Sequence, residues 1–337
     1  MKRTVLALLL LLLPVRAAAA QPGLVLGVDD DSLKWYAHTS SLTSIYRSLG
    51  LGAVRVTLTW PAGASARTEL QRVANAGRGI RVVLAVTGSP WSPPLDGAAR
   101  ADYCGYVAGI LRRYSWIRTE PNSAAFWRPQ HGAAAAYEAL LATCWDAIHA
   151  AQPAANVIAT SAPHARPGDW YAAIGKAYRA SGRTQPVLDT VGHNAYPETS
   201  AESPSARHEH RSIDEGDVAR LTRALRNAFG VAPPVWYLED GFQSTGPAQL
   251  YSGVESDRKP VSEAMQAAQL AAAVGLAYCQ PGVTGFFNFE LRDDASLDGW
   301  QSGLLRPDWS QKPAFAAFRD AVTAARAGAI ACSEAEK

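Results

Sequence analysis

The sequence predicts an α/β fold, a single (β/α)₈ barrel of the TIM-barrel type, from the order of its apolar and amphipathic segments. Eight short apolar runs alternate with stretches whose apolar residues recur at helical spacing, and one such stretch follows each run. The expected strands are 24–28, 53–59, 80–86, 116–119, 157–160, 190–193, 235–238 and 284–289. The expected helices are 41–49, 68–76, 100–114, 132–151, 168–181, 214–229, 262–278 and 313–327.

An open, doubly wound sheet is the structural alternative for such an alternating pattern. That fold places a Gly-rich phosphate loop after the first strand, and no such loop follows residue 28. No internal repeat or low-complexity linker divides residues 21–337, so we expect one domain. The chain is 48% hydrophobic and 18% charged, which excludes a disordered chain. Its net charge of +2, without a Lys/Arg cluster, argues against a nucleic-acid binder.

Residues 1–20 have the pattern of a secretory signal peptide. Lys2 and Arg3 precede a Leu-rich run, and alanines at 17–20 provide small residues for cleavage near Ala20. The run is too short for a permanent transmembrane helix, and no later stretch reaches about 18 uninterrupted apolar residues. We therefore expect a secreted protein, extracellular or periplasmic, with no membrane span. The basic charge belongs to this peptide, because the segment contains three cations and no acid.

The four cysteines are expected to form two disulfide bonds in an exported protein. They show no Cys-x-x-Cys spacing, so they do not indicate a zinc site. Cys104 and Cys144 lie in consecutive helical segments, whereas Cys279 and Cys332 lie in or just after the last two. Of the three possible connectivities we expect Cys104–Cys144 and Cys279–Cys332, each joining neighbouring outer helices. The alternative is four buried free thiols.

Two carboxylates follow expected strands at the same end of the barrel. Glu120 comes directly after the fourth strand, and Glu239 ends the seventh. In a (β/α)₈ barrel the active site lies at the carboxyl ends of the strands, so these side chains can face each other across its mouth. Hydrolysis of a glycosidic bond needs such a pair, because one carboxyl protonates the leaving oxygen and the other attacks carbon or activates water. Asp240 should point to the opposite side of its strand from Glu239 and be structural.

The two carboxylate segments resemble those of clan A glycoside hydrolases, nearest to cellulase-like family 5 and the family 39 barrel. Ile-Arg-Thr-Glu-Pro-Asn at 117–122 is similar to the acid/base segment, and Val-Trp-Tyr-Leu-Glu-Asp-Gly-Phe at 235–242 is similar to the nucleophile strand. Further similar segments occur in the expected order and extend the resemblance over essentially all of residues 21–337. They are 54–60, 126–129, 193–197, 285–289, 303–308 and 312–314.

The resemblance implies a retaining double displacement on a β-linked poly- or oligosaccharide, without a cofactor. Glu120 would be the acid/base and Glu239 the nucleophile. Arg55 would keep Glu239 ionised, Tyr196 would donate a hydrogen bond to it, and His193 would line the sugar subsite. Arg55 could instead be a structural salt-bridge partner, and His193 and Tyr196 could be core residues.

One residue departs from the clan pattern. The clan has Asn immediately before the acid/base, where its amide contacts the sugar 2-hydroxyl, and here that place is Thr119. A threonine hydroxyl is shorter and has one donor. The contact must then be weaker, water-mediated or made by another residue such as Asn122. The departure keeps open a non-catalytic, carbohydrate-binding barrel that has lost turnover.

Aromatic residues and acids near the strand ends provide the remaining expectations. Sugar rings pack on flat aromatic side chains, and we expect about half of the loop tryptophans to touch substrate and the rest to be core. Two histidines, His208 and His210, flank Glu209 without a third ligand at useful spacing, so we expect no metal site. The expected partner is a carbohydrate substrate, with no nucleic acid, and we expect a monomer. The loop tryptophans are Trp60, Trp91, Trp127, Trp170 and Trp300, and of these we expect Trp60, Trp127 and Trp300 to bind substrate.

Overall fold

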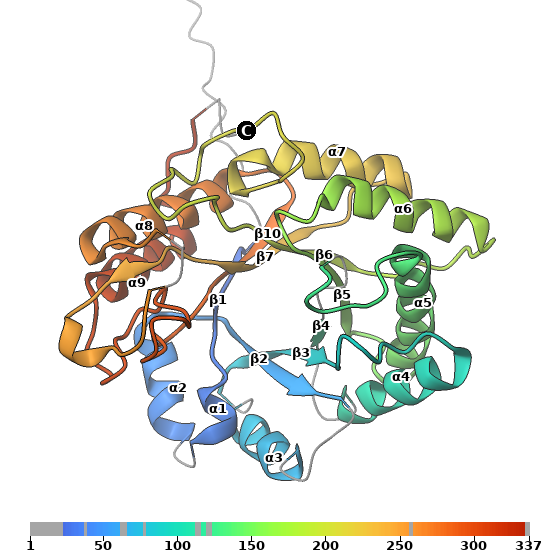
Figure 1. Cartoon of the computed structure of the whole chain (residues 1–337), viewed down its shortest axis with the longest axis horizontal. Coiled ribbons are helices and arrows are strands. Elements are labelled where there is room, and N and C mark those ends of the chain that lie inside the picture. The colour runs from blue at the N-terminus through green and yellow to red at the C-terminus, as the bar shows by residue number, and fades with distance from the viewer. Residues whose placement is uncertain are drawn as a thin grey trace, which may run out of the picture.

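A parallel sheet surrounded by helices forms the centre of the molecule in a computed structural model (Figure 1). The structure describes residues 23–36, 39–60, 66–76, 79–111, 116–118, 123–255 and 259–333. The sheet strands are β1 (Val25–Asp29), β2 (Ala53–Thr59), β3 (Arg81–Thr87), β4 (Trp116–Arg118), β5 (Asn156–Ser161), β6 (Thr190–Asn194), β7 (Val235–Asp240) and β10 (Val283–Asn288). Each pairs in parallel with its neighbours in the order β1-β10-β7-β6-β5-β4-β3-β2, and β1 also pairs with β2, so the pairing returns to its first strand.

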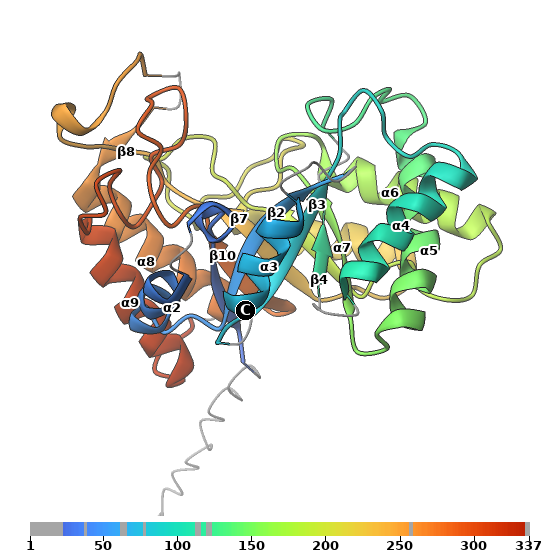
Figure 2. The same cartoon turned by 90° about the horizontal axis from the view of Figure 1, so that it is seen from below.

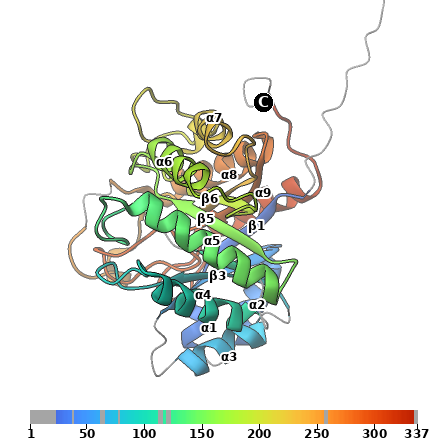
Figure 3. The same ribbon diagram turned by 90° about the vertical axis from the view of Figure 1, so that its right-hand side faces the viewer.

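Helices follow the strands along the chain and cover the outside of the sheet (Figures 1 and 3). Neighbouring helices along the chain, such as α4 with α5 and α5 with α6, are in contact. The helices are α1 (Ser32–Trp35), α2 (Thr39–Ser48), α3 (Ala66–Ala76), α4 (Gly97–Leu111), α5 (Ala133–Ala151), α6 (Pro167–Ala180), α7 (Val218–Phe229), α8 (Glu263–Cys279) and α9 (Pro313–Arg326). The predicted parallel β/α barrel architecture is therefore confirmed.

Short elements in the loops were not predicted. The connection between β7 and α8 contains the two-residue strands β8 (Ser244–Thr245) and β9 (Val261–Ser262) and the 3₁₀ helix η2 (Ala248–Leu250). A second 3₁₀ helix, η1 (Glu215–Asp217), precedes α7. Such elements are too short to produce a periodic apolar pattern. Figure 2 shows β8 on the side of the barrel where the loops that follow the strands gather.

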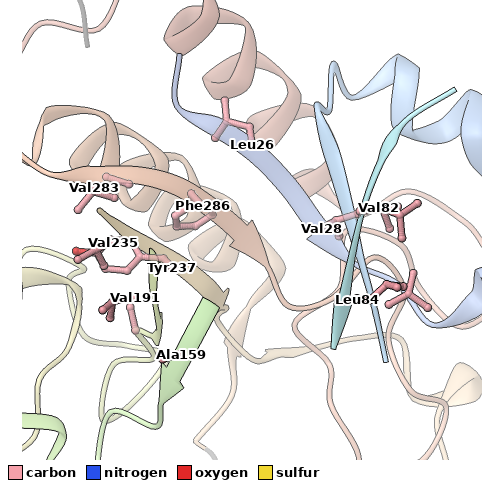
Figure 4. Packing of buried hydrophobic residues seen from close by; sticks show 14 of the residues in the cluster. Leu26, Val28, Val82, Leu84, Ala159, Val191, Val235, Tyr237, Val283 and Phe286 are labelled. Atoms are coloured by element: carbon pink, nitrogen blue, oxygen red, sulfur yellow. The ribbon is translucent and has the colours of Figure 1, made fainter. Parts of the chain in front are cut away.

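Two separate apolar clusters fill the two sides of the sheet. The larger lies between strands and helices, and Figure 4 shows members of it such as Tyr237 on β7 and Phe286 on β10. The smaller consists of Ala53, Val83, Ile158, Trp236, Leu238 and Phe287.

Glycines on the neighbouring strands make room for the large side chains of this inner cluster. A Cβ at Gly285 would lie 2.6 Å from Cγ of Trp236, and one at Gly192 would lie 2.1 Å from Cδ1 of Leu238. Since real Cβ atoms do not approach so closely, the packing requires glycine at these two positions.

Both expected disulfide bonds are present. Cys104 of α4 is bonded to Cys144 of α5, and Cys279 at the end of α8 is bonded to Cys332, which follows α9. Each bond therefore ties together consecutive helical segments of the outer layer. No helix in the described part of the chain has the length and apolar character needed to cross a membrane. The expected signal peptide lies outside the described residues.

Candidate active site

A cavity of about 780 Å³ lies at the carboxyl ends of the strands and contains Glu239 in its wall. Residues from β2, β3, β6 and β7 and from the loops after β3, β4, β5, β6, β7 and β10 line it. Its polar lining includes Arg55, Thr57, His164, Asn194, Tyr196, Glu198 and Glu239. This is the face at which barrels of this architecture carry their chemistry.

Arg55 and Tyr196 both contact the Glu239 carboxylate. Nη2 of Arg55 lies 2.9 Å from Oε1 of Glu239, and the Tyr196 hydroxyl donates a 3.2 Å hydrogen bond to Oε2. The Glu239 side chain is 15% exposed, so it is largely desolvated but still reaches the cavity. A carboxylate held at both oxygens in this way presents a defined direction to a bound molecule.

Arg55 in turn is held by Asp29 on the adjacent strand. Asp29 and Arg55 are partners in the β1–β2 register, and their side chains form an ion pair of 2.5 Å. Alternation along β2 places Ala53 in the inner cluster and therefore Arg55 and Thr57 on the same inner side. The buried guanidinium thus bridges two carboxylates, Asp29 and Glu239, at the floor of the cavity.

An irregularity in β7 aims Glu239 into the cavity. Trp236 and Leu238 belong to the inner cluster, so strict alternation would turn Glu239 outward, away from the cavity. The register shifts here instead: β6 advances one residue, from His193 to Asn194, while β7 advances two, from Tyr237 to Glu239. A similar shift occurs against β10. One extra residue on β7 re-aims a side chain next to a site, as β-bulges commonly do.

Asp240 is fully buried beside Glu215, behind the strand that carries Glu239. Burial raises the pKa of Asp240 to about 7, and burial together with Asp240 raises the pKa of Glu215 well above its usual range. One oxygen of Asp240 accepts a 2.8 Å hydrogen bond from the Gly241 backbone N–H. These contacts match the structural role expected for Asp240.

The raised pKa of Asp240 predicts a pH-dependent stability. An unfolded Asp titrates near about 3.9, so between that pH and about 7 the folded chain holds one more proton than the unfolded chain. The contribution of Asp240 to the free energy of unfolding should therefore fall as the pH rises from about 4 to about 7 and level off above it. Each pKa unit corresponds to about 1.4 kcal/mol. Urea unfolding at pH 5 and pH 8 measures the difference in the free energy of unfolding between the two pH values. This difference should be smaller in Asp240→Asn than in the wild type. It should be unchanged in Asp169→Asn, which alters an exposed carboxylate. Equal slopes in all three proteins would contradict the assignment.

Three residues of the expected site, Thr119, Glu120 and Asn122, lie outside the described residues. The strand before them, β4, is described, and it pairs with β3 and β5. β4 runs parallel to the other strands, so its carboxyl end lies on the side of the sheet that also carries Glu239 and the cavity. Among cavity residues, Phe126 of the same loop is described and is half exposed.

His193 does not line the cavity, in contrast to its expected subsite role. It is completely buried, with Nδ1 3.0 Å from the Ser161 hydroxyl and Nε2 2.7 Å from the carbonyl oxygen of Ile213. Gly192 lies against the inner cluster, so alternation sends His193 to the helix side and returns Asn194 to the cavity. Counting the alternation of β6 from Gly192 would have predicted that Asn194 faces the cavity.

The expected tryptophans divide into different environments. Trp300 lines the cavity and stacks on Tyr196, with ring centroids 5.3 Å apart, and its edge meets Phe289. Trp60 and Trp127 line a smaller neighbouring cavity, which shares Gly88 and Phe126 with the first. Trp127 is buried against Tyr137 and Trp170 is buried too, whereas Trp91 is exposed beside Arg128. Of the three tryptophans expected to bind substrate, Trp300 therefore lies in the cavity with Glu239.

One group among the described residues has the donors for a metal ion. Glu202, His208 and Asp214 each offer one ligand atom, and these atoms lie within 4.8 Å of one another. The spacing argument applied to the sequence missed this group, because its members lie six residues apart on one irregular loop. His210 is not a member; it stacks on His208 and faces Glu198 at 2.9 Å.

Comparisons with known proteins show a shared fold. No protein-family model matches the chain, and no curated protein matches it. Two fungal β-1,4-galactanases are represented by a structure with a TM-score of 0.63 and 15% identity, covering 88% of this chain and 98% of that one. The structure of the exo-β-1,4-mannosidase Op5Man5 from Opitutaceae bacterium strain TAV5 has a TM-score of 0.60 and 16% identity. The match covers 92% of this chain and 61% of that one.

A third similar structure is a GH2 β-galacturonidase from Eisenbergiella tayi, with a TM-score of 0.57 and 14% identity. The match covers 88% of this chain, which spans about half the length of that enzyme. All three solved structures are glycoside hydrolases, so the chain has a fold that glycoside hydrolases use. Identities this low carry the comparison no further than the fold.

Proposed function

We propose that this chain is a secreted, retaining glycoside hydrolase in which Glu239 is the nucleophile and Glu120 the acid/base. The observation that carries the proposal is the Glu239 carboxylate, held by Arg55 and Tyr196 at the wall of a large cavity at the carboxyl ends of the strands. Residues 21–337 would form one (β/α)₈ catalytic domain that acts as a monomer, after removal of residues 1–20.

The proposed reaction proceeds by double displacement. Oε1 or Oε2 of Glu239 attacks the anomeric carbon while Glu120 protonates the departing glycosidic oxygen, which yields a covalent glycosyl-enzyme. Glu120, now ionised, removes a proton from water, and the water oxygen displaces Glu239 with net retention of configuration. Arg55 keeps Glu239 ionised, and the Tyr196 hydroxyl fixes the direction of attack. The mechanism requires the Glu120 and Glu239 carboxyl groups to lie about 5–5.5 Å apart.

The proposed substrate is a β-linked poly- or oligosaccharide. The stacked Tyr196–Trp300 pair and Phe289 form an aromatic wall suited to the apolar face of a sugar ring. Asn194, Thr57 and Thr87 supply amide and hydroxyl partners for sugar hydroxyls from the same cavity. The similar solved structures described as β-galacturonidase, β-1,4-mannosidase and β-1,4-galactanase support the β configuration.

One observation favours a second candidate, a barrel that binds carbohydrate without turnover. Thr119 stands where clan A enzymes have the Asn that contacts the sugar 2-hydroxyl, a contact that strengthens in the transition state. Its loss removes catalytic binding energy and leaves the aromatic wall and the cavity for ground-state binding. The two candidates therefore differ in turnover and agree in ligand class.

The deciding experiment is a hydrolysis assay of the purified chain on aryl β-glycosides and β-linked polysaccharides, with the first product followed by proton NMR. The hydrolase proposal expects the β anomer to form first and to mutarotate afterwards. An α anomer as first product would contradict the retaining mechanism. Binding of a polysaccharide in affinity electrophoresis without any hydrolysis would favour the carbohydrate-binding candidate.

A further inference from the structure

A compact cluster of one histidine and several carboxylates lies in the loop between β6 and α7. Glu202 and His208 belong to the loop, and Asp214 is the last residue before η1. One oxygen of Glu202, one ring nitrogen of His208 and one oxygen of Asp214 lie within 4.8 Å of one another. Donors bound at about 2.0–2.1 Å to a tetrahedral ion are about 3.4 Å apart. Small side-chain rotations are therefore enough to bring the three donors onto one ion.

The Asp214 side chain is only 4% exposed. Neither of its carboxylate oxygens accepts a hydrogen bond from the residues that the structure describes. Two histidines lie near it at longer range, with Oδ2 3.5 Å from Nδ1 of His208 and Oδ1 4.0 Å from Nδ1 of His164. A buried carboxylate without hydrogen bonds is costly, and coordination to a cation is one of the ways in which proteins offset that cost.

The surroundings of His208 resemble the support that metal-binding histidines receive. Nδ1 lies 3.2 Å from Oδ2 of Asp217, and the His208 backbone N–H donates to Oδ1 of the same carboxylate at 3.3 Å. Asp217 is buried, and Arg220 approaches it at 3.5 Å. A carboxylate that orients the ring from outside the ligand set is the usual arrangement around a bound metal ion.

We propose that Glu202, His208 and Asp214 bind one divalent transition-metal ion, with zinc as the representative ion. One imidazole nitrogen and two carboxylate oxygens are a zinc-type ligand set, and the two negative charges balance the ion. Calcium fits the set poorly, because it takes six to eight oxygen ligands. Apolar residues such as Pro197, Pro204 and Phe242 close the space around the group and limit competition by water.

The ion would fasten the loop that forms one wall of the active-site cavity. Residues 196–200 line that cavity, and Glu202 lies two positions after the last of them. Coordination would tie this segment to Asp214, just before η1 and α7. A 2.6 Å hydrogen bond from Gln269 of α8 to the Glu202 carbonyl already holds the segment at a second point. The site thus stabilises the fold locally, and its existence does not depend on the reaction proposed for Glu239.

Zinc binding to untagged, chelator-treated protein tests the proposal, with calorimetric titration and the melting temperature as readouts. We expect one zinc ion per chain and a rise of several degrees in Tm with excess zinc. Asp217→Asn, which changes only the support of His208, should weaken binding about 10–100-fold, and Asp214→Asn and Glu202→Gln should weaken it further. Glu209→Gln, at an exposed neighbouring acid, is the matched control and should bind as the wild type does.

Several outcomes would overturn the assignment. They are no zinc uptake by the wild type, equal uptake by the wild type and the Glu202→Gln variant, and an equal Tm rise with calcium. Glu202 is only partly buried, so its Gln variant keeps the test decisive even if Asp214→Asn fails to fold. Circular dichroism of each variant without metal establishes that the proteins compared are folded.

Discussion

Glu239→Ala is expected to lower kcat/KM by about 10⁴-fold, and azide should restore part of the lost turnover. Removing the nucleophile abolishes the glycosyl-enzyme, and residual activity then depends on binding and acid catalysis alone. The alanine leaves space beside Arg55 and Tyr196 for a small anion to attack the anomeric carbon directly. On an activated aryl β-glycoside the product should be an α-glycosyl azide, which proton NMR identifies by its coupling constant.

Glu120→Ala is the matched control, because it removes the other carboxyl of the proposed pair. Its glycosyl-enzyme still forms on an activated substrate, and azide then attacks that intermediate to give a β-glycosyl azide. Opposite anomers from the two variants would assign both roles in one experiment. The same anomer from both, or full activity in Glu239→Ala, would contradict the proposed mechanism.

The architecture could be predicted from the sequence because barrel strands and their helices differ strongly in periodicity. The disulfide pairing followed from the same pattern, since consecutive outer helices are neighbours in a barrel, and both bonds are confirmed. The lengths of the connecting loops carried no comparable signal. The β8–β9 pair is set by contacts between distant backbone segments, which a local pattern does not encode.

Side-chain direction near the site was predicted less well than position along the chain. The resemblance implied a sugar-subsite role for His193, with a core position as the alternative. Alternation turns His193 towards the helices and brings Asn194 inward. Glu239 faces the cavity through an extra residue in β7, and only the register of β7 against both neighbours reveals that irregularity. A motif therefore located the carboxylate, whereas the fold determined where it points.

The cluster around His208 could not be predicted from the sequence either. Its three proposed ligands occur at every sixth position of an irregular loop, a spacing that is typical of neither a helix nor a hairpin. Two histidines one residue apart drew attention to residues 208–210, but His210 faces Glu198 and does not join the group. Ligand groups assembled by loops become visible only when tertiary structure brings them together.

Arg55→Met is expected to lower the free energy of unfolding by about 3–5 kcal/mol. Arg55 is 7% exposed, and its guanidinium pairs with both Asp29 and Glu239. Methionine keeps much of the volume but leaves two largely buried carboxylates beside each other without this cation. Breaking a buried pair from one side is costly because the remaining charge loses its compensation. Urea unfolding followed by tryptophan fluorescence measures the loss.

A double-mutant cycle distinguishes this charge effect from simple loss of packing. Asp29→Asn in the Arg55→Met background removes one uncompensated charge, so the double variant should be more stable than the sum of the two single losses predicts. Arg55→Lys keeps a positive charge but loses the planar fork that reaches two carboxylates, and its stability should fall between wild type and Arg55→Met. Strictly additive losses would mean that Arg55 acts through packing alone. Coupling of one or more kcal/mol would place the Asp29–Arg55–Glu239 chain among the determinants of both the fold and the direction of the proposed nucleophile.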